Sequence, residues 1–359
     1  GGSGYIGGVN SGTTIAGNNS MPAPGGGIET GQSGDGYVRV TVLNSPPTIN
    51  VTSPSANSVY STVTGYNTIS LSGTICDTDV GNTEQVFYRI DGSAGQAGTQ
   101  IGTNITANGS NQAYSGSINV GSIPAGNHTL YFWAMDNHNV KSAEVAIPIT
   151  IDNTAPTAPT ILANTNWTIA ASVPVVIIAG TDSGSGVNRT EYSLSGATIL
   201  GWTTYTGGFN ISNEGQTTIS ARTIDNVGNI STVSTAIVKV DRTAPTLSFL
   251  PSVDTRVSAS STITVTMTGI DSASGIKEIH YIVLDSTTPV PSKAGCTTIV
   301  STSTASTTIS SEGSNKYVYA YTIDNAGNES SLMQSPLYSV NTKPAVNVTN
   351  PPGGDWFKK

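Results

Sequence analysis

The sequence predicts an all-β protein built from tandem β-sandwiches in an extended array. The first observation is repetition: "ARTIDNVGNIST" at residues 221–232 returns as "AYTIDNAGNESS" at 320–331, with a weaker copy, "FWAMDNHNVKSA", at 132–143. The second is the period, which is 89 and then 99 residues and therefore matches a whole small domain rather than a solenoid turn. The third is a succession of short segments rich in Val, Ile, Thr and Tyr, bounded by Gly, Pro, Asn and Asp.

The repeats divide the chain into modules. Residues 1–44 are rich in glycine and end in a short alternating segment, and the backbone entropy of so much glycine argues against an ordinary core there. Residues 343–359 echo residues 46–61 and indicate a truncated fourth module or, as an alternative, a donor strand that completes a neighbouring subunit. Three complete sandwiches are expected between them, at residues 46–152, 154–241 and 243–341.

Within the second module we expect seven strands, a number that suits an immunoglobulin-like sandwich. They are predicted near residues 159–164, 173–181, 187–194, 202–206, 208–212, 216–225 and 233–241. The sixth strand alternates with period two in all three copies, so that one set of side chains points inward. The inward set is Ile219, Ala221 and Thr223, with Val318, Ala320, Thr322, Leu130, Phe132 and Ala134 as its counterparts.

The repeated Asp-Asn motif lies where the sixth strand must reverse into the seventh. The aspartate can accept backbone N–H bonds, and Gly228 and Gly327 can adopt positive φ without a steric penalty. The first module has Asn139 at the aligned place, and asparagine is the next best occupant of a left-handed position. The repetition is thus interpreted as turn chemistry.

Residues 191–231, "EYSLSGATILGWTTYTGGFNISNEGQTTISARTIDNVGNIS", resemble the bacterial immunoglobulin-like repeats of large surface proteins of the adhesin and stalk type. Tyr192, Trp202, Tyr205 and the turn at 225–229 match the pattern of that family. The third module lacks the Trp-Tyr segment, and the first resembles another immunoglobulin-like subtype. Residues 1–43 resemble the C-terminal part of a glycine-rich domain of exported bacterial proteins. The resemblance implies an architecture rather than an activity.

Composition narrows the function classes. Charged residues make up 10% of the chain, and the formal net charge is −8, which leaves no basic face for nucleic acid or an anionic membrane. The longest apolar run, at residues 173–180, is far shorter than the ~20 residues that a membrane helix requires. A surface of Ser, Thr, Asn and Gly is typical of extracellular proteins. Cys76 and Cys296 fall in different modules and are expected to be unpaired.

The sequence has few residues in the arrangements that catalysis requires, and we expect that the protein is not an enzyme. His128, His138 and His280 show neither metal-ligand nor triad spacing. Six aspartates suggest calcium instead, because immunoglobulin-like loops would bring three of them together at each module junction, where a hard cation could stiffen the linker. The favoured alternative is that each aspartate caps its own turn. The two triads are Asp152, Asp182 and Asp225, and Asp241, Asp271 and Asp324.

The expected function is structural: a cell-surface or secreted stalk, fibre or adhesin segment that can self-associate into a filament. Tyr131, Trp133, Tyr319 and Tyr321 would form glycan-stacking patches only if they are exposed, and packing on the outer sheet face is favoured. The alternatives are a glycan-binding or surface-binding module, spacer domains of a larger secreted enzyme, and a phage tail fibre.

Overall fold

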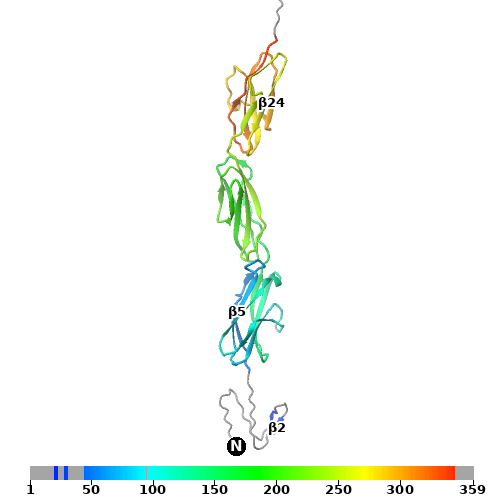
Figure 1. Ribbon diagram of the computed structural model, residues 1–359, viewed down its shortest axis with the longest axis vertical. Helices are drawn as coiled ribbons and strands as arrows, with labels where there is room; N and C mark the ends of the chain where they lie inside the picture. Colours follow the sequence, from blue (N-terminus) through cyan, green and yellow to red (C-terminus); the bar gives the residue numbers. More distant parts are fainter. Residues whose placement is uncertain (1–19, 23–27, 31–43, 94, 344–359) are drawn as a thin grey trace, which may run out of the picture. The chain divides into compact units, whose positions relative to one another are not determined.

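The computed structural model describes residues 20–22, 28–30, 44–93 and 95–343 (Figure 1). The chain divides into two compact units, Gly1–Asp152 and Asn153–Lys359. Strands β1 (Ser20–Pro22) and β2 (Ile28–Thr30) form a two-stranded antiparallel sheet. The predicted segment at 34–43 and nearly all of the predicted fourth module, residues 344–359, lie outside the described residues.

The first unit contains one sandwich with two sheets, of strand order β3-β5-β8 and β4-β10-β9-β6-β7. The short 3-10 helix η1 (Val120–Ser122) connects β8 to the loop before β9. All strand pairs are antiparallel except β4 with β10, which is parallel. The strands are β3 (Thr48–Ser53), β4 (Ser58–Tyr60), β5 (Thr68–Cys76), β6 (Thr83–Ile90), β7 (Thr99–Thr106), β8 (Gln112–Asn119), β9 (Gly126–Asp136) and β10 (Val145–Ile151).

The second unit begins with a sandwich of the same plan, with strand orders β11-β13-β16 and β12-β18-β17-β14-β15. Its second strand, β12, again pairs in parallel with its last strand, β18. The predicted strands are found, and β12 is an addition to them. The strands are β11 (Thr160–Leu162), β12 (Trp167–Thr168), β13 (Val173–Ile178), β14 (Val187–Gly196), β15 (Leu200–Thr204), β16 (Phe209–Ile211), β17 (Gly215–Asp225) and β18 (Ser234–Val240).

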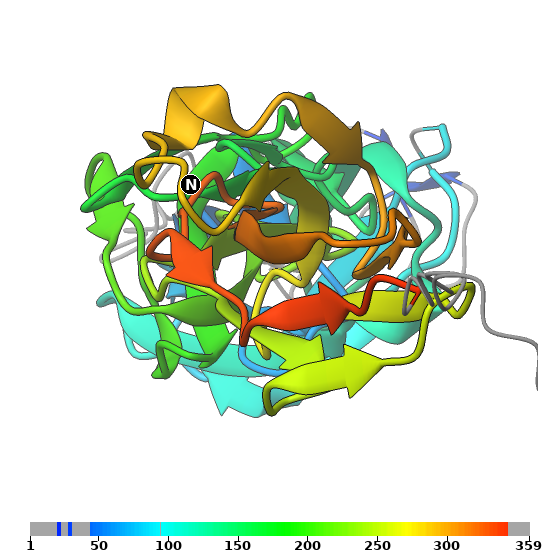
Figure 2. The ribbon, with the colours of Figure 1, turned by 90° about the horizontal axis from the view of Figure 1, so that it is seen from above.

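The third sandwich, also in the second unit, has sheets β19-β21-β24 and β20-β27-β25-β22-β23, with β26 paired to β25. Figure 2 shows its strands in yellow to red. A 3-10 helix, η2 (Lys293–Gly295), lies between β22 and β23. The strands are β19 (Thr246–Leu250), β20 (Thr255–Val257), β21 (Ile263–Ile270), β22 (Ile276–Asp285), β23 (Thr298–Val300), β24 (Thr304–Ile309), β25 (Asn315–Asp324), β26 (Met333–Gln334) and β27 (Tyr338–Val340).

Alternating side chains form the cores, as period-two patterning requires. Along β5, β13 and β21 buried positions alternate with more exposed ones. The predicted inward set on β9, β17 and β25 is fully buried. Each sandwich has its own hydrophobic core cluster, which contains Phe132 in the first, Ile219 in the second and Met267 in the third. The prediction of an all-β chain of tandem immunoglobulin-like sandwiches is therefore confirmed, and no α-helix occurs among the described residues.

Candidate functional site

The aspartate at the end of β25 organises a turn through its carboxylate. Asp324 Oδ1 accepts hydrogen bonds from the backbone N–H groups of Ala326, Gly327 and Asn328 at 2.9, 2.7 and 2.8 Å. Asp324 Oδ2 accepts from Asn328 Nδ2 at 2.8 Å. The side chain is fully buried. One carboxylate thus accepts hydrogen bonds from three backbone N–H groups of the turn after β25, which is the turn that the repeated motif predicts.

The other two sandwiches use the same device. Asp225 Oδ1 accepts from the N–H groups of Val227 and Asn229 at 3.0 and 2.8 Å. Asp136 Oδ1 accepts from those of His138 and Val140 at 2.8 and 2.9 Å, and hydrogen bonds from Asn44, His138 and Val140 keep the pKa of this carboxyl below its usual value although burial acts to raise it. The left-handed residues of the three turns are Asn139, Gly228 and Gly327, with φ of +64°, +86° and +100°.

In the second unit three of the predicted calcium ligands come together. Carboxylate oxygens of Asp241, Asp271 and Asp324 lie within 4.8 Å of one another. Each also has a local partner: Asp241 Oδ1 accepts from Thr243 N at 3.1 Å, and Asp271 Oδ1 accepts from Gly275 N at 2.7 Å. Asp241 Oδ2 accepts in addition from Ser274 N at 3.1 Å, 33 residues further along the chain. These bonds account for the three carboxylates as turn caps, and calcium at this group stays a prediction.

The other predicted triad is divided between the two units. Asp182 and Asp225 belong to the second unit, and their carboxylate oxygens approach within 4.8 Å. Asp182 Oδ2 accepts from Gly186 N at 2.6 Å, which closes the turn before β14. Asp152 is the buried last residue of the first unit, and its N–H donates to Tyr60 O at 2.8 Å. A calcium site of these three residues stays a prediction.

A further acidic group in the first sandwich was not recognised from the sequence. Glu84 on β6 is 1% exposed and Asp77, directly after β5, is 3% exposed. Burial raises the pKa of the Glu84 carboxyl to about 8, and the neighbouring carboxylates of Asp77, Asp136 and Asp79 add to the increase. The signal available in the sequence was "CDTDVGNTEQ", in which three acidic residues lie within eight positions.

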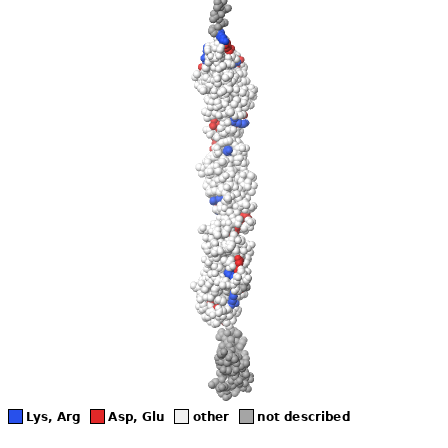
Figure 3. All heavy atoms as spheres, turned by 90° about the vertical axis from the view of Figure 1, so that its right-hand side faces the viewer, with Lys and Arg blue, Asp and Glu red and all other residues white. Residues whose placement is uncertain are grey.

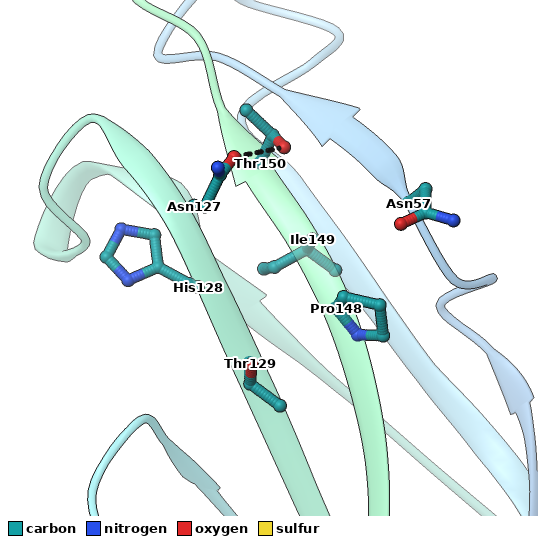
Figure 4. Close-up of a pocket in the computed structure, with 7 residues that line it drawn as sticks. All are labelled: Asn57, Asn127, His128, Thr129, Pro148, Ile149 and Thr150. Carbon is teal, nitrogen blue, oxygen red and sulfur yellow. Dashed lines mark hydrogen bonds between the residues drawn. The ribbon is translucent and has the colours of Figure 1, made fainter.

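Two of the three histidines, His128 and His280, lie beside carboxylates. His128 contacts Asp91 Oδ2 at 2.6 Å and Pro124 O at 2.8 Å, while His280 lies between Glu278 Oε1 and the Tyr321 hydroxyl. A hollow of about 280 Å³ beside His128 is lined by residues of β9, β10 and the loop before β4 (Figure 4). Its dashed hydrogen bond joins Thr150 Oγ1 to Asn127 Oδ1 at 2.9 Å. The lining also contains the hydroxyl groups of Thr129 and Thr150.

The aromatic residues considered for glycan stacking are mostly covered. Trp133 is 5% exposed and stacks on Phe87 with ring centroids 5.7 Å apart, and Lys141 Nζ lies 4.1 Å from the centre of its ring. Tyr319 and Tyr321 pack with Cys296 in a separate buried cluster. Cys76 and Cys296 form no disulfide with each other, and an intermolecular disulfide stays the alternative. These side chains therefore stabilise the outer sheet faces instead of presenting a flat aromatic surface.

Comparisons with known proteins give only distant likenesses. No protein-family model and no curated protein matches the chain. Fibronectin(III)-like modules of Clostridium thermocellum CbhA are 17% identical with a TM-score of 0.28, covering 54% of this chain and 96% of that one. The FN1-FN3 domains of chicken CNTN1 are 12% identical with a TM-score of 0.23, covering 82% and 98%. The D00-D0 domain of Intimin is 13% identical with a TM-score of 0.22, covering 54% and 98%.

Proposed function

We propose that the chain is a non-enzymatic extracellular spacer that resists mechanical force, as a segment of a cell-surface stalk, fibre or adhesin. The observation that carries the proposal is shared by all three sandwiches. In each, a short strand near the beginning pairs in parallel with the last strand. The pairs are β4 with β10, β12 with β18, and β20 with β27.

This pairing decides how a pulling force enters the fold. A force applied to the two ends of a sandwich draws the strand near its beginning, β4, β12 or β20, and its last strand in opposite directions along their length. The backbone hydrogen bonds between parallel strands lie across that direction, so they are loaded in shear and must break together. In the third sandwich Thr255 N donates to Leu337 O at 2.9 Å and Asn341 N donates to Val257 O at 3.0 Å.

The surface supports an extracellular role and gives no support to nucleic-acid binding. Figure 3 shows few and scattered charged atoms on one face of the described residues, in agreement with a charged content of 10%. A basic patch of the kind that binds phosphate backbones is not visible on that face. In the described part of the chain, no helix has the length and apolar character that crossing a membrane demands.

Self-association and contact with a cell surface or glycan complete the proposal. Each sandwich has sheet-edge strands, such as β7, β15 and β23, and an edge strand offers unpaired backbone groups to another chain. The buried state of Trp133 and Tyr321 favours such backbone contacts over aromatic stacking on sugars.

The test is a matched pair of proline variants stretched as single molecules. Thr255→Pro removes the N–H that donates to Leu337 O, directly before β27, while Arg256→Pro changes the next residue, whose N–H points to the opposite side. We expect a clear decrease in the unfolding force of the third sandwich for Thr255→Pro and a much smaller one for Arg256→Pro. Equal forces in the two variants and the unmodified chain would contradict the proposal.

A further inference from the structure

Glu84 occupies a place where the other two sandwiches have an apolar residue. In each sandwich the strand β6, β14 or β22 has one residue directly opposite the turn aspartate of the neighbouring strand. The opposed pairs are Glu84 with Asp136, Val187 with Asp225, and Ile276 with Asp324. Valine and isoleucine are therefore compatible with this position, and the first sandwich places a second carboxylate there instead.

Three oxygens of this group have no hydrogen-bond partner. Both carboxylate oxygens of Glu84 and Oδ2 of Asp77 are inaccessible to solvent and unbonded. A hydrogen bond between the two carboxyl groups would require a shared proton, because ionised carboxylates only accept. A buried carboxylate without a partner is costly, because it has lost water and gained nothing in exchange.

The acidic residues around Glu84 add negative potential, and none of them donates a hydrogen bond to the three oxygens. Asp136 is already engaged, with Oδ1 accepting from two backbone N–H groups and Oδ2 accepting from Asn44 Nδ2. Asp79 Oδ2 accepts from Ser45 N at 2.5 Å. The charged groups that act on Glu84 are all acidic: Asp77, Asp136 and Asp79. The group therefore has ligand oxygens and negative potential together, as a cation site requires.

We propose that Glu84 and Asp77 bind a hard divalent cation, Ca²⁺, at the end of the first sandwich. Both oxygens of Glu84 and Oδ2 of Asp77 supply three ligands, and water and backbone carbonyls complete the six to eight oxygens that Ca²⁺ takes, at about 2.3–2.6 Å. Asp136 and Asp79 contribute negative potential without being ligands. The site shares no residue with the two predicted triads, which contain Asp225 and Asp324.

A proton held between Glu84 and Asp77 is the competing occupant, and hydrogen exchange of the full-length chain distinguishes the two. Backbone exchange in residues 77–84 is followed in 1 mM CaCl₂, in 1 mM MgCl₂ and in chelator. Extracellular calcium modules have dissociation constants near 10⁻⁴ M, so 1 mM Ca²⁺ is expected to slow exchange of this segment about tenfold. Magnesium is expected to act more weakly, since it demands a stricter octahedral geometry.

The variants localise the effect. Glu84→Gln keeps the shape of the side chain, and Glu84→Val introduces the residue found at the equivalent place in the second sandwich. Both are expected to lose the calcium response in residues 77–84, whereas Asp271→Asn in the second unit is expected to keep it. Slow backbone hydrogen exchange of β9 in chelator, as in the unmodified chain, shows that a variant is folded. The proposal is overturned if Ca²⁺ leaves exchange of 77–84 unchanged in the unmodified chain, or slows it equally in Glu84→Gln.

Discussion

Replacing Asp324 by alanine tests the turn that the repeated motif encodes. The change removes acceptors for three backbone N–H groups and one side-chain amide. Hydrogen bonds to a charged group contribute about 1.5–3 kcal/mol each, but the turn is partly exposed and water can replace some of them. We therefore expect Asp324→Ala to lower the free energy of unfolding by about 3 kcal/mol. Asp324→Asn keeps one uncharged acceptor and is expected to cost about half as much.

Calorimetry in chelator measures the cost without any contribution from metal. For a sandwich of about 100 residues, 1 kcal/mol shifts the melting temperature by about 4–8 °C, so Asp324→Ala should lower that of the third sandwich by at least about 12 °C. The control is Asp285→Ala in the same sandwich, whose side chain is 60% exposed and pairs only with Lys316, and whose effect should be close to zero. A shift for Asp324→Ala no larger than that of this control would refute the account of the turn.

Three further predictions follow from particular residues. Gly327→Ala is expected to cost about 1–2 kcal/mol through its φ of +100° alone, because the added Cβ meets no atom within 4 Å, whereas Gly201→Ala, equally open but without positive φ, should be nearly neutral in chemical denaturation. If calcium binds Asp241, Asp271 and Asp324, Ca²⁺ raises the melting temperature, and Asp271→Asn removes the part of the increase that comes from these three residues. A melting temperature that is the same in Ca²⁺ and in chelator disproves this site. Hydrogen bonds from Arg89 and Lys141 lower the pKa of Glu144 to about 2, so its stabilising contribution is present above pH ~4.5 and is lost as the pH falls toward 2. The melting temperature of Glu144→Gln should lack this pH dependence.

The sequence was sufficient for the fold because its main signals are local. Alternation along β17 predicts which of its side chains are buried, and the Asp-Asn motif predicts where β17 and β25 end. Along β25 the outer-face residues Tyr319 and Tyr321 are buried as well. The strand β12 was missed for the opposite reason. It has two residues, Trp167 and Thr168, and exists only through its pairing with β18, which lies some seventy residues further along the chain. Two residues cannot display a period, so no local pattern indicates such a strand.

The candidate site was predicted in part for a similar reason. Asp241, Asp271 and Asp324 could be grouped from the sequence because immunoglobulin-like loops with known order share one end of a sandwich. No local pattern marks Glu84 as buried, because a charged residue on a strand normally lies on the outer face. Its inward direction depends on the register of β6 against β9, with a bulge toward β7 directly after it. That register is a property of the assembled sheet.

Stretching the unmodified chain by its two ends tests the central claim most directly. Three independent sandwiches, each closed by a parallel pair in shear, predict three separate unfolding events. At ~3.5 Å per residue, each event should release about 25–35 nm of chain. The result that contradicts the account is a smooth extension without distinct force peaks, or fewer events with correspondingly longer releases, since either would show that the sandwiches do not resist force as separate units.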